Sequence, residues 1–197
     1  MNTPGPAGAT SAGDAIGLGA GEPFDVRALL ADRVRDVPDW PQPGVIFKDI
    51  TPLLGDHVAF AHAVDAIVAH RGRGTVDKVV GIEARGFIIA APVAYHFGAG
   101  FVPVRKKGKL PSATFERSYT LEYAEATLEV HRDAFSVGEK VLIVDDVLAT
   151  GGTVEATAAL VQAAGAEVVG CSVLIELAFL GGRDRLAGLP VHSLLTY

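Results

Sequence analysis

One segment in the second half of the chain constrains the fold more than any other. Residues 140–144 form an apolar, β-branched run that leads directly into Asp145 and Asp146. A run of this kind is typical of a buried parallel strand, because both faces of such a strand are covered. The small residues 149–153 follow, and then an Ala-rich stretch that Gly165 closes. The segment therefore predicts a buried strand, a tight turn and the N-terminus of a helix.

Helical and extended patterns alternate along the rest of the chain. Apolar residues recur with the helical period over Phe24–Val37 and Asp56–His70. An apolar stretch at Phe87–Phe97 and an Ala-rich stretch at Thr153–Ala164 predict two further helices. Apolar or alternating runs predict strands at Lys78–Ile82, Phe101–Arg105, Thr127–His131 and Glu167–Ile175. In the third of these, Thr127, Glu129 and His131 are expected on a solvent-facing side. The order predicts an α/β fold with a mostly parallel central sheet flanked by helices on both faces.

Two stretches without a period are expected to be irregular. Residues 38–52 contain four prolines, each of which lacks a backbone donor, so this segment is predicted to be extended. Residues 106–118 are basic and contain Gly108 and Pro111, which predicts a mobile loop. Irregular segments of this kind often carry binding groups.

The length of the chain predicts a single domain. A chain of 197 residues is long enough for one full hydrophobic core and short for two. Residues 1–22 are rich in Gly and Ala and lack the basic start and apolar middle of a signal peptide, so they are expected to form a disordered tail. The domain is predicted to span residues 23–197. No apolar stretch approaches the roughly 20 residues of a membrane helix.

Charge and cysteine content narrow the function classes. Seventeen Lys and Arg residues against 23 Asp and Glu give a formal charge of −6, which disfavours binding to nucleic acid or to anionic membranes. The only cysteine, Cys171, lies in an apolar run and is expected to be a core residue. One cysteine allows no internal disulfide, which suits a reducing cytoplasm.

The segment that follows the buried strand suggests a phosphate site. Residues 149–153 offer backbone N–H groups, two hydroxyls and little bulk at a helix N-terminus, where the helix dipole favours an anion. The carboxylates of Asp145 and Asp146 can accept hydrogen bonds from ribose hydroxyls nearby. The pattern therefore predicts a site for ribose 5-phosphate. A metal-binding Asp pair and a glycine-rich turn without a ligand are the alternatives.

Residues 141–153 closely resemble the motif that binds 5-phosphoribosyl-1-pyrophosphate (PRPP) in type I phosphoribosyltransferases: four apolar residues, two acids, two variable residues and then Ala-Thr-Gly-Gly-Thr. Four further segments resemble the adenine-specific branch of that family, namely residues 43–50, 83–87, 105–111 and 118–123. The resemblance covers nearly the whole chain after residue 22. It implies the type I phosphoribosyltransferase fold, with a small N-terminal hood and a flexible lid loop.

The resemblance also implies a reaction and its partners. The family acts in purine salvage: it transfers phosphoribosyl from PRPP to N9 of adenine and releases AMP and pyrophosphate. Mg²⁺ is implied as a cofactor that arrives with PRPP, with no ligand from protein side chains. A homodimer is implied as well.

Site residues carry over from the family by position. Ribose and 5′-phosphate binding is implied for Asp145, Asp146, Ala149, Thr150, Gly151, Gly152 and Thr153. Pyrophosphate binding is implied for Glu83, Ala84, Arg85, Arg105, Lys106, Lys109 and Tyr123, with a non-proline cis peptide in the loop of residues 83–86. Adenine binding is implied for Ile46, Phe47, Lys48 and either Val147 or Leu148.

The resemblance also implies one catalytic group and leaves the role of one side chain open. Glu122 is implied as the acid/base group, because a carboxylate that accepts the proton at N7 makes adenine more nucleophilic at N9. Many family members carry Arg where this chain has Lys48, so its role belongs either to the side chain or to the backbone N–H. A transferase for another base, such as a 6-oxopurine or orotate, and a PRPP-sensing regulator remain as alternative functions.

Overall fold

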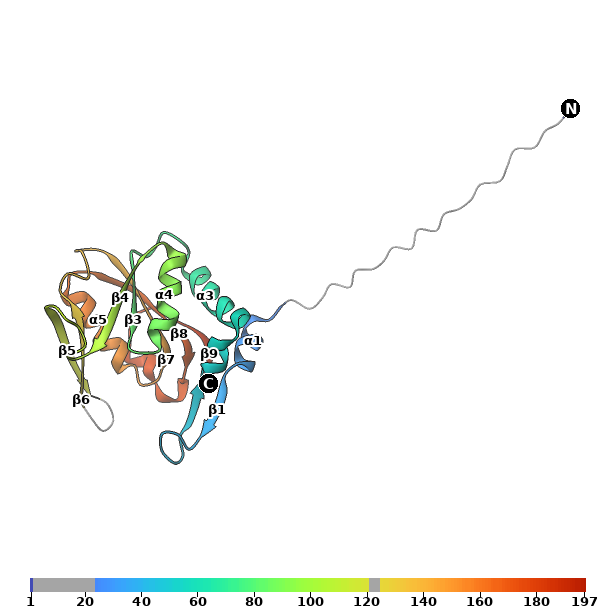
Figure 1. The fold of residues 1–197 in the computed structure, drawn as a ribbon, viewed down its shortest axis with the longest axis horizontal. Helices are drawn as coiled ribbons and strands as arrows, with labels where there is room; N and C mark the ends of the chain where they lie inside the picture. The colour runs from blue at the N-terminus through green and yellow to red at the C-terminus, as the bar shows by residue number, and fades with distance from the viewer. Residues whose placement is uncertain (2–23, 121–124) are drawn as a thin grey trace.

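The computed structural model describes Met1 and residues 24–120 and 125–197; apart from Met1, the predicted tail of residues 1–22 lies outside the described residues. A seven-stranded sheet forms the centre of the molecule (Figure 1). Its strands, in order across the sheet, are β5 (Thr114–Thr120), β6 (Glu125–His131), β4 (Gly100–Lys106), β3 (Lys78–Ile82), β7 (Lys140–Leu148), β8 (Glu167–Glu176) and β9 (Val191–Thr196). From β4 to β9 neighbouring strands run parallel, whereas β6 is antiparallel to β4 and β5. The predicted mostly parallel sheet is confirmed.

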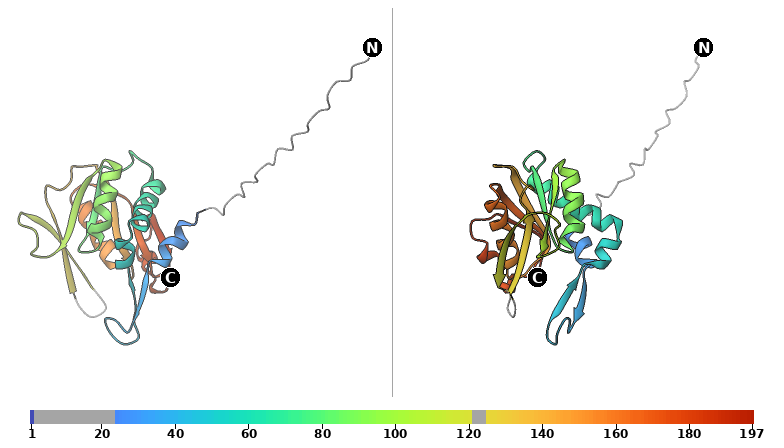
Figure 2. Two further views of the ribbon diagram at one scale, coloured as in Figure 1. Left: turned by 45° about the vertical axis from the view of Figure 1, so that its right-hand side comes forward. Right: turned by 60° about the vertical axis from the view of Figure 1, so that its left-hand side comes forward.

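Helices cover both faces of the sheet, as predicted (Figure 2). One face is covered by α1 (Val26–Asp32), α2 (Thr51–Gly55), α3 (His57–Arg71) and α4 (Gly86–Phe97), and the other by α5 (Gly152–Ala163) and the short α6 (Gly182–Arg185). Successive residues of β7 alternate between the two cores: Leu142 packs in the first and Ile143 in the second. Cys171 is buried in the second core.

The ends of α3 follow the chemistry of its flanking residues. The Asp56 carboxylate accepts hydrogen bonds from the backbone N–H groups of Val58 and Ala59, at 3.0 and 3.2 Å. This satisfies two donors that the first turn of a helix leaves without partners. Gly72 ends the helix with a φ of 80°. The predicted helix at Asp56–His70 is therefore confirmed to within one residue.

The first predicted helix, Phe24–Val37, is too long. It ends at Asp32, and Arg35–Pro38 forms β1, which pairs antiparallel with β2 (Ile46–Asp49). The predicted irregular segment 38–52 therefore contains a strand and the start of α2. Pairing with the next strand along the chain overrides the local helical period, because Val37 gains a partner in Phe47. The resulting two-stranded sheet is the N-terminal hood that the family resemblance implied.

The basic loop predicted at residues 106–118 is also shorter than expected. Thr114–Thr120 forms β5, which pairs with β6 from Thr114 opposite His131 to Thr120 opposite Glu125. Phe115 and Tyr119 pack against the second core, so alternate side chains of β5 are held. This pairing is the physical reason for the strand. The 3₁₀-helix η1 (Ala178–Leu180), α6 and β9 were not foreseen from the sequence.

Gly86 allows α4 to approach β7 closely. A Cβ atom at this position would lie 2.5 Å from Asp145 Oδ1 and 3.2 Å from the Val144 carbonyl oxygen. The absence of a side chain therefore places the first turn of α4 directly against the acidic end of β7. In the residues that the structure describes, no helix combines the length and apolar character needed to cross a membrane.

Candidate active site

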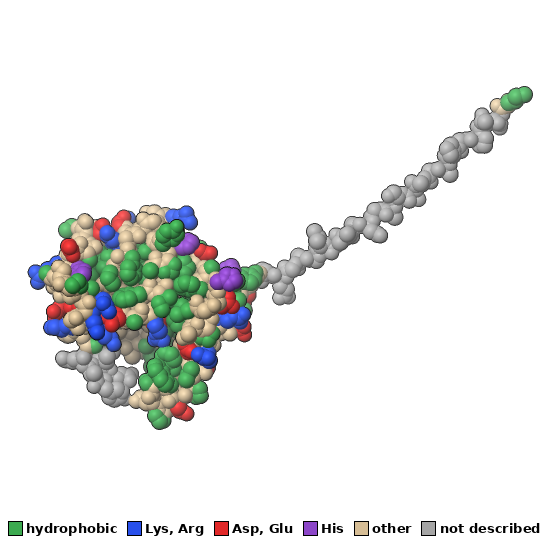
Figure 3. All heavy atoms as spheres, viewed as in Figure 1, with side chains coloured by type: hydrophobic (Ala, Val, Ile, Leu, Met, Phe, Trp, Pro, Cys, Tyr) green, Lys and Arg blue, Asp and Glu red, His purple; other side chains and the backbone are tan. Residues whose placement is uncertain are grey.

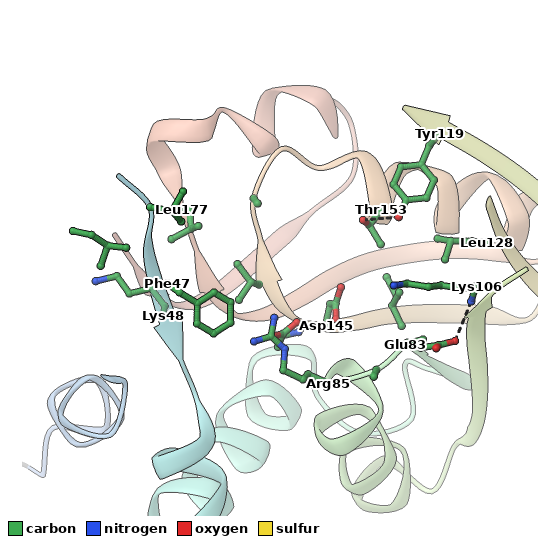
Figure 4. Close-up of a pocket in the computed structure, with 17 residues that line it drawn as sticks. Phe47, Lys48, Glu83, Arg85, Lys106, Tyr119, Leu128, Asp145, Thr153 and Leu177 are labelled. Carbon is green, nitrogen blue, oxygen red and sulfur yellow. Dashed lines mark hydrogen bonds and ion pairs between the residues drawn. The ribbon is translucent and has the colours of Figure 1, made fainter. Parts of the chain in front are cut away.

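A cavity of about 440 Å³ opens at the carboxyl ends of β3, β4 and β7, next to the hood (Figure 4). This edge of a parallel sheet is where α/β proteins bind their ligands. The hood, the loop after β3, the end of β4, the β5–β6 pair and the end of β7 all contribute. The lining residues are Val45, Ile46, Phe47, Lys48, Ile82, Glu83, Ala84, Arg85, Lys106, Tyr119, Leu128, Asp145, Asp146, Val147, Ala149, Thr153 and Leu177.

The turn between β7 and α5 forms one wall of the cavity, to which it contributes Ala149 and Thr153. Gly151 has a φ of 82°, and a Cβ atom there would lie 2.6 Å from the carbonyl oxygen of Gly182. A Cβ atom on Gly182 would collide with the Ala149 carbonyl. The turn is thus packed, backbone to backbone, on the segment that begins α6. This packing fixes where the first N–H groups of α5 point.

Asp145 and Asp146 are both buried at the end of β7. Asp145 Oδ1 accepts a hydrogen bond from the backbone N–H of Asp146 at 2.9 Å. Burial, with the nearby charge of Asp146, raises the pKa of Asp145 well above its usual range, although Arg85 acts in the opposite direction. Two carboxylates are therefore held together in a site where the ionised form of one is disfavoured.

Arg85 lies between the acidic pair and the hood. Its Nε is 2.7 Å from Asp146 Oδ2, and its guanidinium carbon is 5.0 Å from the centroid of the Phe47 ring. Asp146 Oδ2 has no partner with hydrogen-bond geometry, so the contact is a charge pair and not an aligned hydrogen bond. The peptide bond between Glu83 and Ala84 is cis, as the resemblance implied.

A half-buried carboxylate, that of Glu83, and a buried one, that of Glu129, hold the basic segment of residues 105–109 at the end of β4. Glu83 Oε2 accepts hydrogen bonds from Arg105 Nε at 3.2 Å and from the Lys106 N–H at 3.0 Å. Burial acts to raise the pKa of Glu83, but the Lys106 N–H and the Arg105 charge outweigh it and leave the pKa below its usual value. Arg105 also donates to the carbonyl of Lys109 at 3.2 Å. In the structure, Glu83 therefore contacts the guanidinium of Arg105 and the backbone of Lys106.

Glu129 of β6 holds the same basic segment. The prediction that its side chain faces solvent is wrong. Only 3% of the residue is exposed, and its Oε1 accepts from the backbone N–H groups of Lys109 and Leu110 at 2.8 and 2.7 Å. The alternating pattern of β6 placed Glu129 on the correct face, but the basic segment folds over that face. Lys106 lines the cavity, whereas Lys107 pairs with Glu116.

The opposite wall of the cavity is apolar. Phe47 of β2 points into the cavity, and its ring packs against Trp40 with 4.3 Å between ring centroids (Figure 4). Val147 also lines this wall, whereas Leu148 is 1% exposed and packs in the second core. Of the two residues offered by the sequence, Val147 is therefore the one at the cavity. The reason is strand alternation, which sends Leu148 to the other face.

Lys48 and Leu177 complete this wall in ways the sequence did not indicate. The Lys48 ammonium lies 2.7 Å from Asp36 Oδ1 and 3.9 Å from the centroid of the Tyr197 ring, so its charge is engaged away from the acidic pair. Leu177 follows β8 directly, and the sequence analysis missed it. The sequence feature that could have indicated Leu177 is the apolar run of β8, because the residue that follows a parallel strand lies at the ligand-binding edge of the sheet.

Glu122 and Tyr123 lie outside the described residues, so their implied roles stay predictions. The strands on either side, β5 and β6, are described, and Tyr119 of β5 reaches the cavity. Within residues 24–120 and 125–197, no cluster of three or more His, Cys, Asp and Glu side chains could hold a metal ion.

Comparisons with known proteins agree with this geometry. Residues 54–188 match the model of the phosphoribosyl transferase domain. An adenine phosphoribosyltransferase of Acidothermus cellulolyticus is 63% identical over 173 residues, which cover 88% of this chain and 98% of that protein. The crystal structure of adenine phosphoribosyltransferase from Rhodothermus marinus is 53% identical with a TM-score of 0.83, over 87% of this chain and 98% of that one.

A third relative was solved with ligands. The Saccharomyces cerevisiae adenine phosphoribosyltransferase, in complex with adenine and an imino-altritol bisphosphate, is 35% identical with a TM-score of 0.83, over 86% of this chain and 98% of that one. The cavity, the match to the domain model and these relatives lead to one assignment. The chain belongs to the phosphoribosyltransferase family and, within it, to the adenine phosphoribosyltransferases.

Proposed function

We propose that this chain transfers phosphoribosyl from PRPP to N9 of adenine and releases AMP and pyrophosphate. One observation carries the proposal: a single cavity brings together a turn suited to phosphate, a pair of carboxylates and an apolar wall with an aromatic ring. The turn matches the phosphate of AMP, the carboxylates match its ribose, and the apolar wall matches its adenine. The relatives named adenine phosphoribosyltransferase, and the yeast structure that holds adenine beside a bisphosphate, support this reading.

The sugar phosphate is assigned to the end of β7 and the turn that follows. Asp145 and Asp146 accept hydrogen bonds from the ribose hydroxyls, and their charge stabilises the positive charge that builds on the ribose ring as the bond to pyrophosphate breaks. The 5′-phosphate is assigned to the N-terminus of α5, where the helix dipole favours an anion. Its binding residues are Ala149, Thr150, Gly151, Gly152 and Thr153.

Pyrophosphate is assigned to the loop after β3 and to the basic segment of residues 105–109 at the end of β4. Ala84, Arg85 and Lys106 line the cavity there and can face the diphosphate directly. Glu83 orders Arg105 and Lys106 through the hydrogen bonds described above, and the backbone of Lys109 is held by Glu129. Arg85 can exchange its charge contact with Asp146 for the diphosphate, because both are anions within the reach of one flexible side chain. Tyr123 is assigned here from the family resemblance alone.

Adenine is assigned to the apolar slot that Phe47, Val147 and Leu177 line. A flat apolar ring gains burial and stacking in such a slot. Ile46 and Lys48 contribute backbone groups, since the Lys48 ammonium is engaged by Asp36 and Tyr197. As the N9 to sugar carbon bond forms and the carbon to diphosphate bond breaks, the proton at N7 passes to the Glu122 carboxylate.

Mg²⁺ is proposed to enter bound to PRPP. The adjacent carboxylates of Asp145 and Asp146 give the cavity an anionic wall that suits a cation carried by an anionic substrate. When bound, the ion neutralises charge on the departing diphosphate. A cytoplasmic location stays a prediction from the single cysteine, which is buried.

A homodimer is proposed from the outer surface of α4. Ile88, Tyr95 and Phe101 are exposed there or on the adjoining β4, and Tyr95 is 83% exposed. Hydrophobic side chains gather over α4 in the space-filling view (Figure 3). Ile88 and Tyr95 are seven residues apart and therefore lie on the same face of the helix. A second copy of the chain that covers this face would bury these side chains.

The base preference tests the proposed function. Pyrophosphate release is measured with PRPP and adenine, hypoxanthine, guanine or xanthine. Adenine is expected to exceed the others in kcat/KM by at least about 10³-fold, because a 6-oxo group presents an acceptor where adenine presents a donor. A preference for another base would overturn the substrate assignment. If none of the four bases gives pyrophosphate release, the alternative of a PRPP-sensing regulator would be favoured.

Glu122→Gln tests the proton acceptor. The amide cannot accept the N7 proton as a base, so kcat is expected to fall by about 10²-fold while the KM for PRPP stays within about twofold. Steady-state kinetics with varied PRPP separate the two parameters. Glu167→Gln is the control, because Glu167 begins β8 at the edge of the sheet away from the cavity, and this variant should match the wild type. An unchanged kcat in Glu122→Gln removes this residue from the mechanism.

Asp145→Asn tests whether function conflicts with stability at the acidic pair. In the unfolded chain Asp145 ionises above about pH 3.9, whereas in the folded state its raised pKa shifts ionisation to higher pH. Folding stability is therefore lost as pH rises from about 4 toward the folded pKa, and Asn escapes this loss. The variant should melt higher at pH 8, by about 2–4 °C per kcal/mol of repulsion removed. This gain should shrink at pH 4.5, and transfer activity should be lost.

The matched control for this experiment is Asp65→Asn, an exposed position on α3. It should leave both the melting temperature and the activity near the wild-type values. A fall in the melting temperature of Asp145→Asn at pH 8 would contradict the proposed repulsion.

The double variant Ile88→Asp, Tyr95→Asp tests the dimer. Sedimentation velocity at micromolar concentration is expected to give a dimer for the wild type and a monomer for the variant, because two carboxylates cannot be buried without partners. Val137→Asp, at an exposed position outside α4, is the control and should remain dimeric. A wild-type monomer, or a variant that still dimerises, would exclude α4 as the interface.

A further inference from the structure

Tyr119 connects the β5–β6 pair to the turn that is proposed to bind the 5′-phosphate. Its hydroxyl lies 3.3 Å from Thr153 Oγ1, with Thr153 as the donor. The same ring lies over the start of α5, since a Cβ atom on Gly152 would be 3.3 Å from Tyr119 Cδ2. Tyr119 also lines the cavity, where its ring stands beside Thr153 (Figure 4). The phenol is therefore placed at the mouth of the phosphate turn.

The strand geometry explains this placement. Tyr119 lies opposite Ala126 of β6, and its side chain packs toward α5 and the second core. The neighbouring Ser118 lies on the other face of the same strand, where its hydroxyl pairs with Thr127 at 2.9 Å. Of these two hydroxyls, that of Tyr119 is the one directed to the cavity.

The hydrogen-bond direction leaves the Tyr119 proton available. A phenol carries one proton and two acceptor lone pairs, and here the oxygen accepts from Thr153. Its own proton can therefore be donated to an anion in the cavity. A phosphate dianion has three terminal oxygens that accept such bonds, and a hydrogen bond to a charged group is stronger than one between neutral groups.

We propose that Tyr119 is a binding residue for the 5′-phosphate of PRPP and AMP, and that its hydroxyl closes this subsite from the side of β5. The proposal rests on the proposed function, because that function places the phosphate at residues 149–153. It adds a donor from a different part of the fold. Binding of the phosphate is thereby coupled to the position of the β5–β6 pair.

A packing role is the competing explanation, and Tyr119→Phe separates the two. The phenylalanine keeps the ring against Gly152 and removes only the hydroxyl. Affinities for AMP, ribose 5-phosphate and adenine are measured by titration calorimetry on the full chain. AMP and ribose 5-phosphate are expected to bind about tenfold more weakly, whereas adenine changes by less than about twofold. The KM for PRPP should rise by a similar factor, with kcat within about threefold of the wild type.

Ser118→Ala is the matched control, since it removes a hydroxyl hydrogen bond from the same strand on the opposite face. It should bind all three ligands like the wild type. AMP affinity in Tyr119→Phe within twofold of the wild type would overturn the proposal, as would an equal loss for adenine, which would indicate a packing defect. Failure of the wild type to bind AMP and ribose 5-phosphate would overturn the proposed function itself.

Discussion

The two carboxylates at the end of β7 are held closer together than their charges favour, and much of the site is arranged around them. Asp145 and Asp146 are buried side by side, and the pKa of Asp145 is raised by burial and by its neighbour. Gly86 lets α4 approach so closely that Asp145 is confined, and Arg85 supplies the nearby positive charge. An acidic pair that lowers the stability of the fold persists where it contributes to a reaction. This pair can contribute by stabilising a positive charge that develops on ribose.

The rest of the cavity shows how an acidic protein can present cations to an anionic ligand. The half-buried Glu83 and the buried Glu129 hold the basic segment of residues 105–109 by its backbone and by Arg105. Their negative charges offset the repulsion among the lysines and arginine of that segment while the ligand is absent. The basic groups are thus ordered before they meet a diphosphate, which reduces the entropy that binding must overcome.

The site is assembled from segments that are far apart in the chain. The hood contributes Phe47, the sheet edge contributes the acidic pair, and β5 contributes Tyr119. The first and last of these groups belong to the two antiparallel pairs, β1 with β2 and β5 with β6, whereas the acidic pair belongs to the parallel part of the sheet. The rigid, doubly covered strands position the reacting sugar, and the antiparallel pairs bring the groups that surround it.

The sequence by itself determined the parallel sheet, the turn between β7 and α5 and most of the residues that line the cavity, because an apolar strand, two acids and a small-residue turn into a helix are local features. The segments that resemble the family supplied the rest of that prediction. Only the tertiary structure decided that Arg35–Pro38 is a strand, that Glu129 is buried, and that Val147 and not Leu148 faces the cavity. The strand at Arg35–Pro38 depends on its pairing with Ile46–Asp49, and the burial of Glu129 depends on the segment that folds over it, and the helical period and alternation contain neither contact. Alternation separates Val147 from Leu148, but only the fold decides which face of β7 meets the cavity.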